Sequence, residues 1–244
     1  MKKPKKLFYV ILCAAFAVFA WSGISLFNVT RAAAPAIELQ DDVIEQIETT
    51  NLEVALSEKT AKDGTATILA DKATILGGVT KFTPGTAVYD EIAAANTADA
   101  PEFVRIIVRT YWKNADGVKD LSLNTDWIKL DYNGSAYNTG GWVLNGAEST
   151  RETDVYYLTT ALPAGATSVP LFNGITVDKK VASEYVVHED TENRIITYEY
   201  KYDQCSACIE LEVQSVQTTD ATNAIRSVWG VRNVTASGTT LSVQ

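Results

Sequence analysis

The residues that could carry out chemistry are few and widely spaced. The chain has 244 residues, with one histidine, His188, and three cysteines. A metalloprotease helix holds zinc with two histidines one turn apart around a glutamate (H-E-x-x-H), and no second histidine follows His188. The G-x-S-x-G turn of serine hydrolases is also missing from the sequence. We therefore expect no catalytic residue, metal or cofactor, and we place His188 in a polar surface loop.

A CxxC pair, Cys205 and Cys208, is the second chemical feature. A zinc site would need two further ligands, and a cysteine nucleophile would need a paired histidine. Strands are expected at 195–202 and 209–214, which would form a hairpin with the pair at its tip. Residues three apart approach closely enough to bond only in such a tight turn. Thiols outside the cytoplasm oxidise, so the sequence predicts a Cys205–Cys208 disulfide, with a redox pair as the alternative.

The strongest strand signal covers residues 104–112. Val104, Ile106 and Val108 share one face at a period of two, while Arg105 and Arg109 share the other. Two solvated guanidinium groups with stems on the sheet are the simplest interpretation. A carboxylate-binding arginine pair is the alternative.

Alternating patterns predict eight to ten strands and one helix, all after residue 50. The helix is expected at 219–230, where apolar residues follow a helical spacing and Gly230 ends it. Strands are expected at 51–56, 88–95, 104–112, 127–132, 140–144, 155–158, 171–177, 185–187, 195–202 and 209–214, with a weak hairpin over 66–76. The prediction is an all-β fold, an antiparallel two-sheet sandwich that forms a single domain over residues 51–244.

An apolar leader precedes this domain. Residues 2–6 carry four lysines, and residues 7–27 form an uncharged, mostly apolar run. This run is long for a signal peptide and long enough to span a bilayer as a helix. We predict that residues 1–36 are either a signal peptide, removed by signal peptidase, or an N-terminal membrane anchor. The lysines keep the N-terminus inside, so the domain is extracellular, secreted or attached to the cell surface.

Residues 37–50 form an acidic N-terminal arm. The arm contains aliphatic side chains with no obvious place in a compact core: Ile37, Leu39, Val43, Ile44 and Ile47. We predict that the arm is an assembly segment that adds to a sheet edge of the next subunit. A helix or a spacer between the membrane and the domain is the alternative.

Charge and tryptophan content limit the partners. The formal net charge is −9, and the first 36 residues contain bases but no acid, so the rest of the chain is still more acidic. This charge argues against nucleic acid as a partner. Four tryptophans follow the leader, and we expect most of them in the core, with sugar stacking and subunit contact as alternatives: Trp112, Trp127, Trp142 and Trp229.

An ordered series of short motifs resembles one family. Residues 96–108 fit N-T-x5-[FY]-V-R-[IV]-x-V, followed by Trp112. A G-W-V strand, a Y-Y strand, an L-x-x-G-x-T turn and a closing A…W-G segment then come in the same order over residues 140–230. This series resembles the TasA/camelysin group of exported proteins from Gram-positive bacteria.

The resemblance implies a jelly-roll type of sandwich and a non-catalytic protein of the biofilm matrix or cell surface. Relatives in that group assemble into fibres by lending a strand to a neighbour, so self-association or other matrix proteins are the implied partners. Camelysin-type relatives carry a peptidase label, which the residues around His188 do not support. A carbohydrate-binding surface module is the remaining alternative.

Overall fold

The computed structural model describes residues 53–70, 75, 83–132, 141–191 and 194–244. The chain divides into two units, Met1–Leu39 and Gln40–Gln244, and every described residue lies in the second. The expected leader and the assembly segment with Ile37, Leu39, Val43, Ile44 and Ile47 lie outside the described residues. Within the described part, no helix has the length and apolar character needed to cross a membrane.

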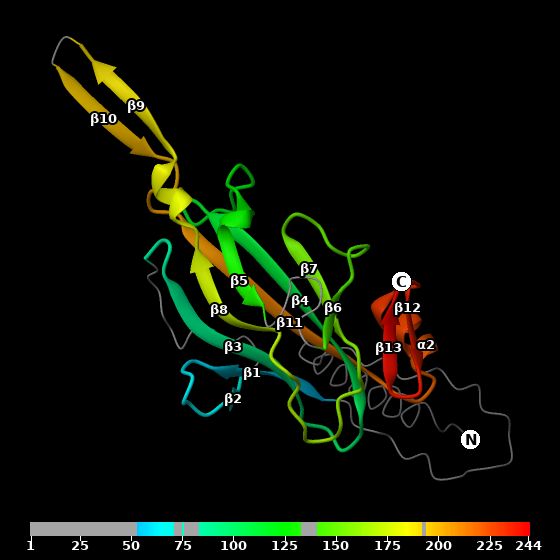
Figure 1. Cartoon of the computed structure of the whole chain (residues 1–244). Helices are drawn as coiled ribbons and strands as arrows, with labels where there is room; N and C mark the ends of the chain where they lie inside the picture. The colour runs from blue at the N-terminus through cyan, green and yellow to red at the C-terminus, as the bar shows by residue number, and fades with distance from the viewer. Residues whose placement is uncertain (1–52, 71–74, 76–82, 133–140, 192–193) are drawn as a thin grey trace, which may run out of the picture. The chain divides into compact units, whose positions relative to one another are not determined.

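One sheet has five antiparallel strands (Figure 1). In spatial order these are β2 (Thr67–Ile68), β1 (Val54–Lys59), β3 (Ala87–Asn96), β8 (Phe172–Val177) and β5 (Ile128–Tyr132). Of the weak hairpin expected over 66–76, the first strand is β2, which pairs with β1, and residues 71–74 and 76 lie outside the described residues. The helical turn η2 (Thr125–Trp127) leads into β5.

The second sheet has four antiparallel strands, in the order β11 (Ser206–Gln217), β4 (Glu102–Lys113), β7 (Thr153–Leu158) and β6 (Trp142–Leu144). The predicted strand at 104–112 is β4, and it lies between β11 and β7. β4 and β11 pair along their whole length, with Ile106 opposite Val213.

The core between the two sheets is built from alternate residues of their strands. From β4, Val104, Ile106 and Val108 face Ile92 of β3 and Ile175 of β8 within one buried cluster. This confirms an all-β fold of antiparallel sheets, because side chains alternate between the faces of each strand and one set from each sheet is removed from water.

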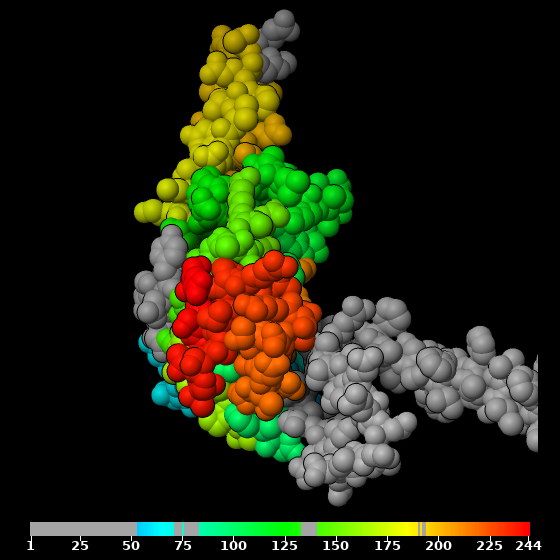
Figure 2. Space-filling model, turned by 90° about the vertical axis from the view of Figure 1, so that its right-hand side faces the viewer, coloured from blue at the N-terminus to red at the C-terminus, as the bar shows by residue number. Residues whose placement is uncertain are grey.

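C-terminal elements form a further layer. They are the short helix α2 (Ala221–Ala224), the π-helical turn η4 (Ile225–Trp229) and the hairpin of β12 (Val234–Ser237) and β13 (Thr240–Val243). Their side chains bury Phe103 and Ile107 of β4. Figure 2 shows these elements in orange and red on the face turned to the viewer. The face of β4 that carries Arg105 and Arg109, expected to be solvated, is therefore buried over the first half of the strand, and Arg105 is buried with it.

The predicted hairpin of residues 195–202 and 209–214 is wrong. Residues 195–200 form β10 (Ile195–Tyr200), which pairs with β9 (Tyr185–Asp190), and β11 pairs with β4. β9 follows the helical turn η3 (Lys179–Ser183). Periodicity locates a strand but does not select its partner, and β11 gains a twelve-residue partner by pairing with β4.

Candidate functional site

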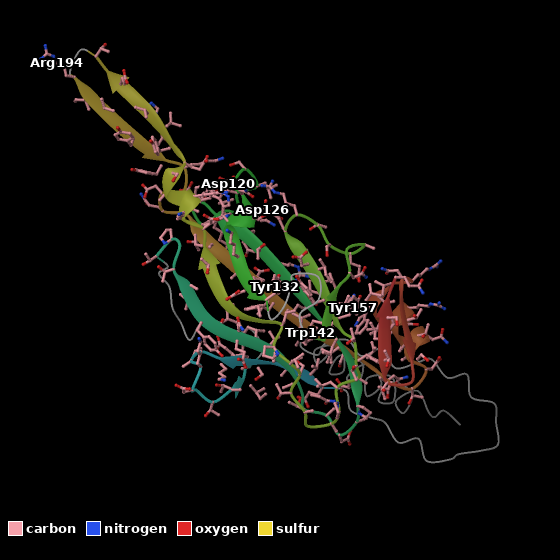
Figure 3. All side chains as sticks on the ribbon, viewed as in Figure 1. Asp120, Asp126, Tyr132, Trp142, Tyr157 and Arg194 are labelled. Carbon is pink, nitrogen blue, oxygen red and sulfur yellow. The ribbon has the colours of Figure 1, made fainter. Side chains whose placement is uncertain are left out.

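The β9–β10 hairpin is the candidate functional site because both of its faces are exposed. Neither sheet of the sandwich extends into it, and it stands apart from them in Figure 1. Arg194, labelled in Figure 3, marks its turn end. Seven large hydrophobic side chains of the hairpin are exposed: Tyr185, Val186, Val187, Ile195, Ile196, Tyr198 and Tyr200. An isolated two-stranded hairpin is only marginally stable in water, so this much exposed apolar surface indicates an interaction site.

One face of the hairpin, here called the aromatic face, carries most of the large rings. The register places Tyr185 opposite Tyr200, Val187 opposite Tyr198 and Glu189 opposite Ile196. The Tyr185 ring lies 5.3 Å from that of Tyr198 and 5.6 Å from that of Tyr200, both edge-on. These contacts order the rings into one surface.

The opposite face is mixed in polarity. It carries Val186, His188, Ile195, Thr197 and Glu199, and His188 Nε2 lies 2.7 Å from Glu199 Oε2. His188 is exposed, as expected, but it lies in a strand and not in a loop. The described residues contain no cluster of three or more His, Cys, Asp or Glu side chains that could hold a metal ion.

The base of the hairpin is fixed to the sandwich by Tyr202. Its ring lies 4.9 Å from Trp112 and 5.1 Å from Trp127, and its hydroxyl accepts the Asn124 N–H at 2.9 Å. The Lys201 N–H donates to the Glu184 carbonyl at 2.9 Å, which closes the two strands at this end. The hairpin is therefore anchored at one end, and the described side chains along β9 and β10 are exposed.

The structure separates the two cysteines. Cys205 precedes β11 and packs with Trp112 and Tyr202, whereas Cys208 lies within β11 opposite Tyr111. Side chains alternate along a strand, so Cys208 points away from the face on which Cys205 packs. Both are free thiols, and burial raises the pKa of each. The Cys205–Cys208 disulfide stays a prediction, and it would require a local change at the start of β11.

Both arginines of β4 pair with carboxylates of the chain itself. The buried Arg105 donates to Glu148 Oε1 at 3.0 Å, to the Tyr157 hydroxyl at 3.0 Å and to Gln214 Oε1 at 2.9 Å. Arg109 lies nearer the surface and donates to Glu212 Oε2 at 2.9 Å. A shallow hollow of about 270 Å³ lies over this end of β4, lined by Arg109, Tyr111, Lys113, Lys119, Glu152, Thr153 and Glu210. Its three bases and two acids lie together, with Lys119 paired to Glu152, so the hollow does not select one sign of charge.

The tryptophans of the domain pack in its core. Trp112, Trp142 and Trp229 are buried, and Trp127 is half-buried against Tyr202. Figure 3 shows Trp142 within the sandwich. A row of exposed tryptophans, which sugar stacking would need, is not found among the described residues.

The hairpin had a partial signal in the sequence. Two β-rich runs flank the polar residues 188–194, which is a hairpin pattern, and the tyrosines of the second run share one parity. Sequence reasoning paired that run with the wrong strand, and it therefore missed the exposure of the aromatic face.

Comparison of the chain with protein-family models, curated proteins and solved structures finds no match.

Proposed function

We propose that the protein is an exported, non-catalytic structural protein of the cell surface or biofilm matrix that assembles through β-strand contacts. The observation that carries the proposal is the exposed aromatic face of the β9–β10 hairpin. In the monomer the hairpin leaves this apolar area in water, and burying it against another protein is favourable.

The leader supports the export part of the proposal. A basic start and an apolar run direct residues 51–244 out of the cytoplasm, whether residues 1–36 are cleaved by signal peptidase or stay as a membrane-anchoring helix. The resemblance to the TasA/camelysin group adds the biofilm matrix or cell surface as the place of action. The acidic composition supports protein partners over nucleic acid.

A jelly-roll type of sandwich is part of the proposal. It is supported by the way successive strands change sheets: β3 lies in the first sheet, β4 in the second, β5 in the first, β6 and β7 in the second, β8 in the first and β11 in the second. Such crossings between sheets are typical of Greek-key and jelly-roll connections.

Two elements are proposed to take part in assembly. The first is the hairpin, and the second is the acidic arm of residues 37–50, which would add as a strand to a neighbouring subunit. Long edge strands can accept such a strand, and β11 pairs with β4 on one side only in the described sheet. These contacts have different geometry, so two variants separate them.

The test replaces the hairpin without disturbing its base. Residues 185–200 are exchanged for Asn-Gly, which closes a tight turn between Glu184 and Lys201, already joined by a hydrogen bond. The protein is recovered from an exporting host, and self-association is followed by light scattering and electron microscopy. We expect this variant to keep its thermal unfolding midpoint and to lose self-association. A second variant without residues 37–50 measures the contribution of strand donation.

Equal self-association of the parent and of both variants, at matched concentration, would contradict the proposed assembly. Recovery of the parent protein in the cytoplasm of the exporting host would contradict the proposed location. Retention of all protein as monomer up to millimolar concentration would contradict the structural role itself.

A further inference from the structure

We propose that the aromatic face binds the same face of a second copy of this chain, with the two hairpins antiparallel, so that the turn end of each lies over the base of the other. This inference rests on the proposed function, because it names the partner and geometry of one of its contacts. The arrangement has two-fold symmetry, and each hairpin contributes the same residues.

The chemistry of the aromatic face differs between its two ends. Glu189, at the turn end, is the one charged side chain among the described residues of this face, whereas the base end presents the hydroxyls of Tyr185 and Tyr200. In the antiparallel arrangement β9 lies over β9 of the second copy, which brings Glu189 against Tyr185. A tyrosine hydroxyl can donate to a carboxylate, so the charge gains a partner as it leaves water.

The parallel arrangement lacks this match. It would place Glu189 over Ile196 of the second copy, whose side chain has no donor, and a carboxylate buried without a donor is costly. It would also bring the two turn ends together. The sequence of residues 188–194 contains three acids and one base, so like charges would meet.

Charges at the base favour the same choice. Lys179 and Lys180 of η3 and Lys201 after β10 are exposed at the base. The acids within four residues of them are Asp178, Glu184, Glu199 and Asp203, of which Asp178 pairs with Lys129 and Glu199 with His188. The antiparallel arrangement sets these lysines beside the acidic turn of the second copy. Complementary charge at both ends of an interface selects its orientation.

The size of the face predicts a weak dimer. Tyr185, Tyr198 and Tyr200 are 47%, 52% and 48% exposed. With about 200 Å² for a whole tyrosine side chain, the three rings together with Val187 and Ile196 expose roughly 450 Å² on each copy. A dimer through this face would therefore bury roughly 900 Å² over the two copies. Stable complexes bury about 1,200 Å² or more, so the pair should form at the high local concentration of a surface layer or matrix.

The test introduces one new cysteine at a time into the full chain, in which Cys205 and Cys208 are replaced by serine and Cys13 is kept. The antiparallel arrangement brings Tyr198 over Tyr198 of the second copy, so Tyr198→Cys should form a disulfide-linked dimer under mild oxidation. Thr197→Cys, one residue away on the opposite face, is the matched control. The link is mapped to position 198 by mass spectrometry, which separates it from any dimer through Cys13.

A charge exchange tests the orientation independently. Tyr185→Glu sets a carboxylate over Glu189 of the second copy, and we expect the dimer dissociation constant from sedimentation to rise at least tenfold. Adding Glu189→Lys to that variant should restore dimerisation to within about threefold of the parent.

Cross-linking at position 198 no greater than at position 197, or a double variant as weak as Tyr185→Glu alone, would overturn this inference. If either result occurs while self-association still needs the hairpin, the proposed function stands and its geometry is different. If the hairpin replacement leaves self-association unchanged, the hairpin part of the proposed function fails together with this inference.

Discussion

Arg105 shows how far a residue's surroundings can depart from its sequence context. It lies in the middle of an apolar strand, yet its guanidinium is enclosed by Glu148, Tyr157 and Gln214, with the Trp229 ring centre 5.0 Å away. These partners come from a turn, two other strands and the C-terminal layer. The buried charge therefore ties that layer to the second sheet, since a paired charge inside a protein is tolerated only with all its partners in place.

We predict that Arg105→Ala destabilises the fold by about 3–5 kcal/mol, because it leaves Glu148 without its cation in a mostly buried site. Arg109→Ala is the matched control, and it should cost less than about 1 kcal/mol because the Arg109–Glu212 pair is partly exposed. Urea unfolding of both variants measures the free energies. Equal losses of unfolding free energy in the two variants would show that the Arg105 network stabilises the fold no more than the exposed Arg109–Glu212 pair does.

Glu102 gives a prediction for pH. Its side chain is buried and accepts the Glu53 N–H at 2.9 Å, and burial raises the pKa of its carboxyl above 4.5. The native state therefore binds this proton more tightly than the unfolded state, and stability decreases as pH rises from the unfolded pKa through the raised native pKa.

We predict that Glu102→Gln is more stable than the parent at pH 7 and that the difference vanishes near pH 4. The amide keeps an acceptor for Glu53 and has no charge to bury. Thermal unfolding across this pH range measures the effect. Asp178→Asn is the control with the opposite sign, because Lys129 lowers the pKa of Asp178 and its contribution is present at neutral pH and lost in acid. A parent and Glu102→Gln with parallel pH profiles would refute the assignment.

At the scale of elements, the strands of the β9–β10 hairpin and the Tyr202 contact at its base contribute differently to stability. Along β9 and β10 every described side chain is exposed, whereas Tyr202, two residues beyond β10, packs between Trp112 and Trp127. Stability depends on area removed from water, so the stability of the fold should depend on Tyr202 at the base and not on the exposed strands of the hairpin.

We predict that Tyr202→Ala lowers the free energy of unfolding by about 2–4 kcal/mol, through lost ring packing and the lost acceptor for Asn124. Tyr198→Ala should change the stability of the monomer by less than about 0.5 kcal/mol. Calorimetry at low protein concentration keeps dimerisation out of the comparison. A large loss of stability in Tyr198→Ala would mean that the hairpin packs on the sandwich in solution.

At the scale of the described domain, β4 has both of its faces covered by the first sheet and the C-terminal layer, as does the neighbouring β7. Alternate side chains of its first half enter the core between the sheets or the core beneath the C-terminal layer. The chain carries a formal charge of −9, so copies repel one another over most of their surface. Association is then expected at a face with few charged side chains, and Glu189 is the one charged side chain among the described residues of the aromatic face.

Features that depend only on near neighbours could be predicted from the sequence. The strands β3, β4, β7 and β8, the core parity of Val104, Ile106 and Val108, and the placement of most tryptophans in the core all followed from local periodicity and composition. Side-chain direction alternates along any extended chain, so these features need no knowledge of the partner strand.

Tertiary structure alone decided what depends on partners far along the chain. β11 pairs with β4 about a hundred residues away, which leaves β10 to β9, separates Cys205 from Cys208 and exposes the aromatic face. Arg105 is buried because residues 221–243 fold over its strand. The choice among similar strands is settled by which pairing buries the most surface and satisfies the most backbone groups, and that sum runs over the whole domain.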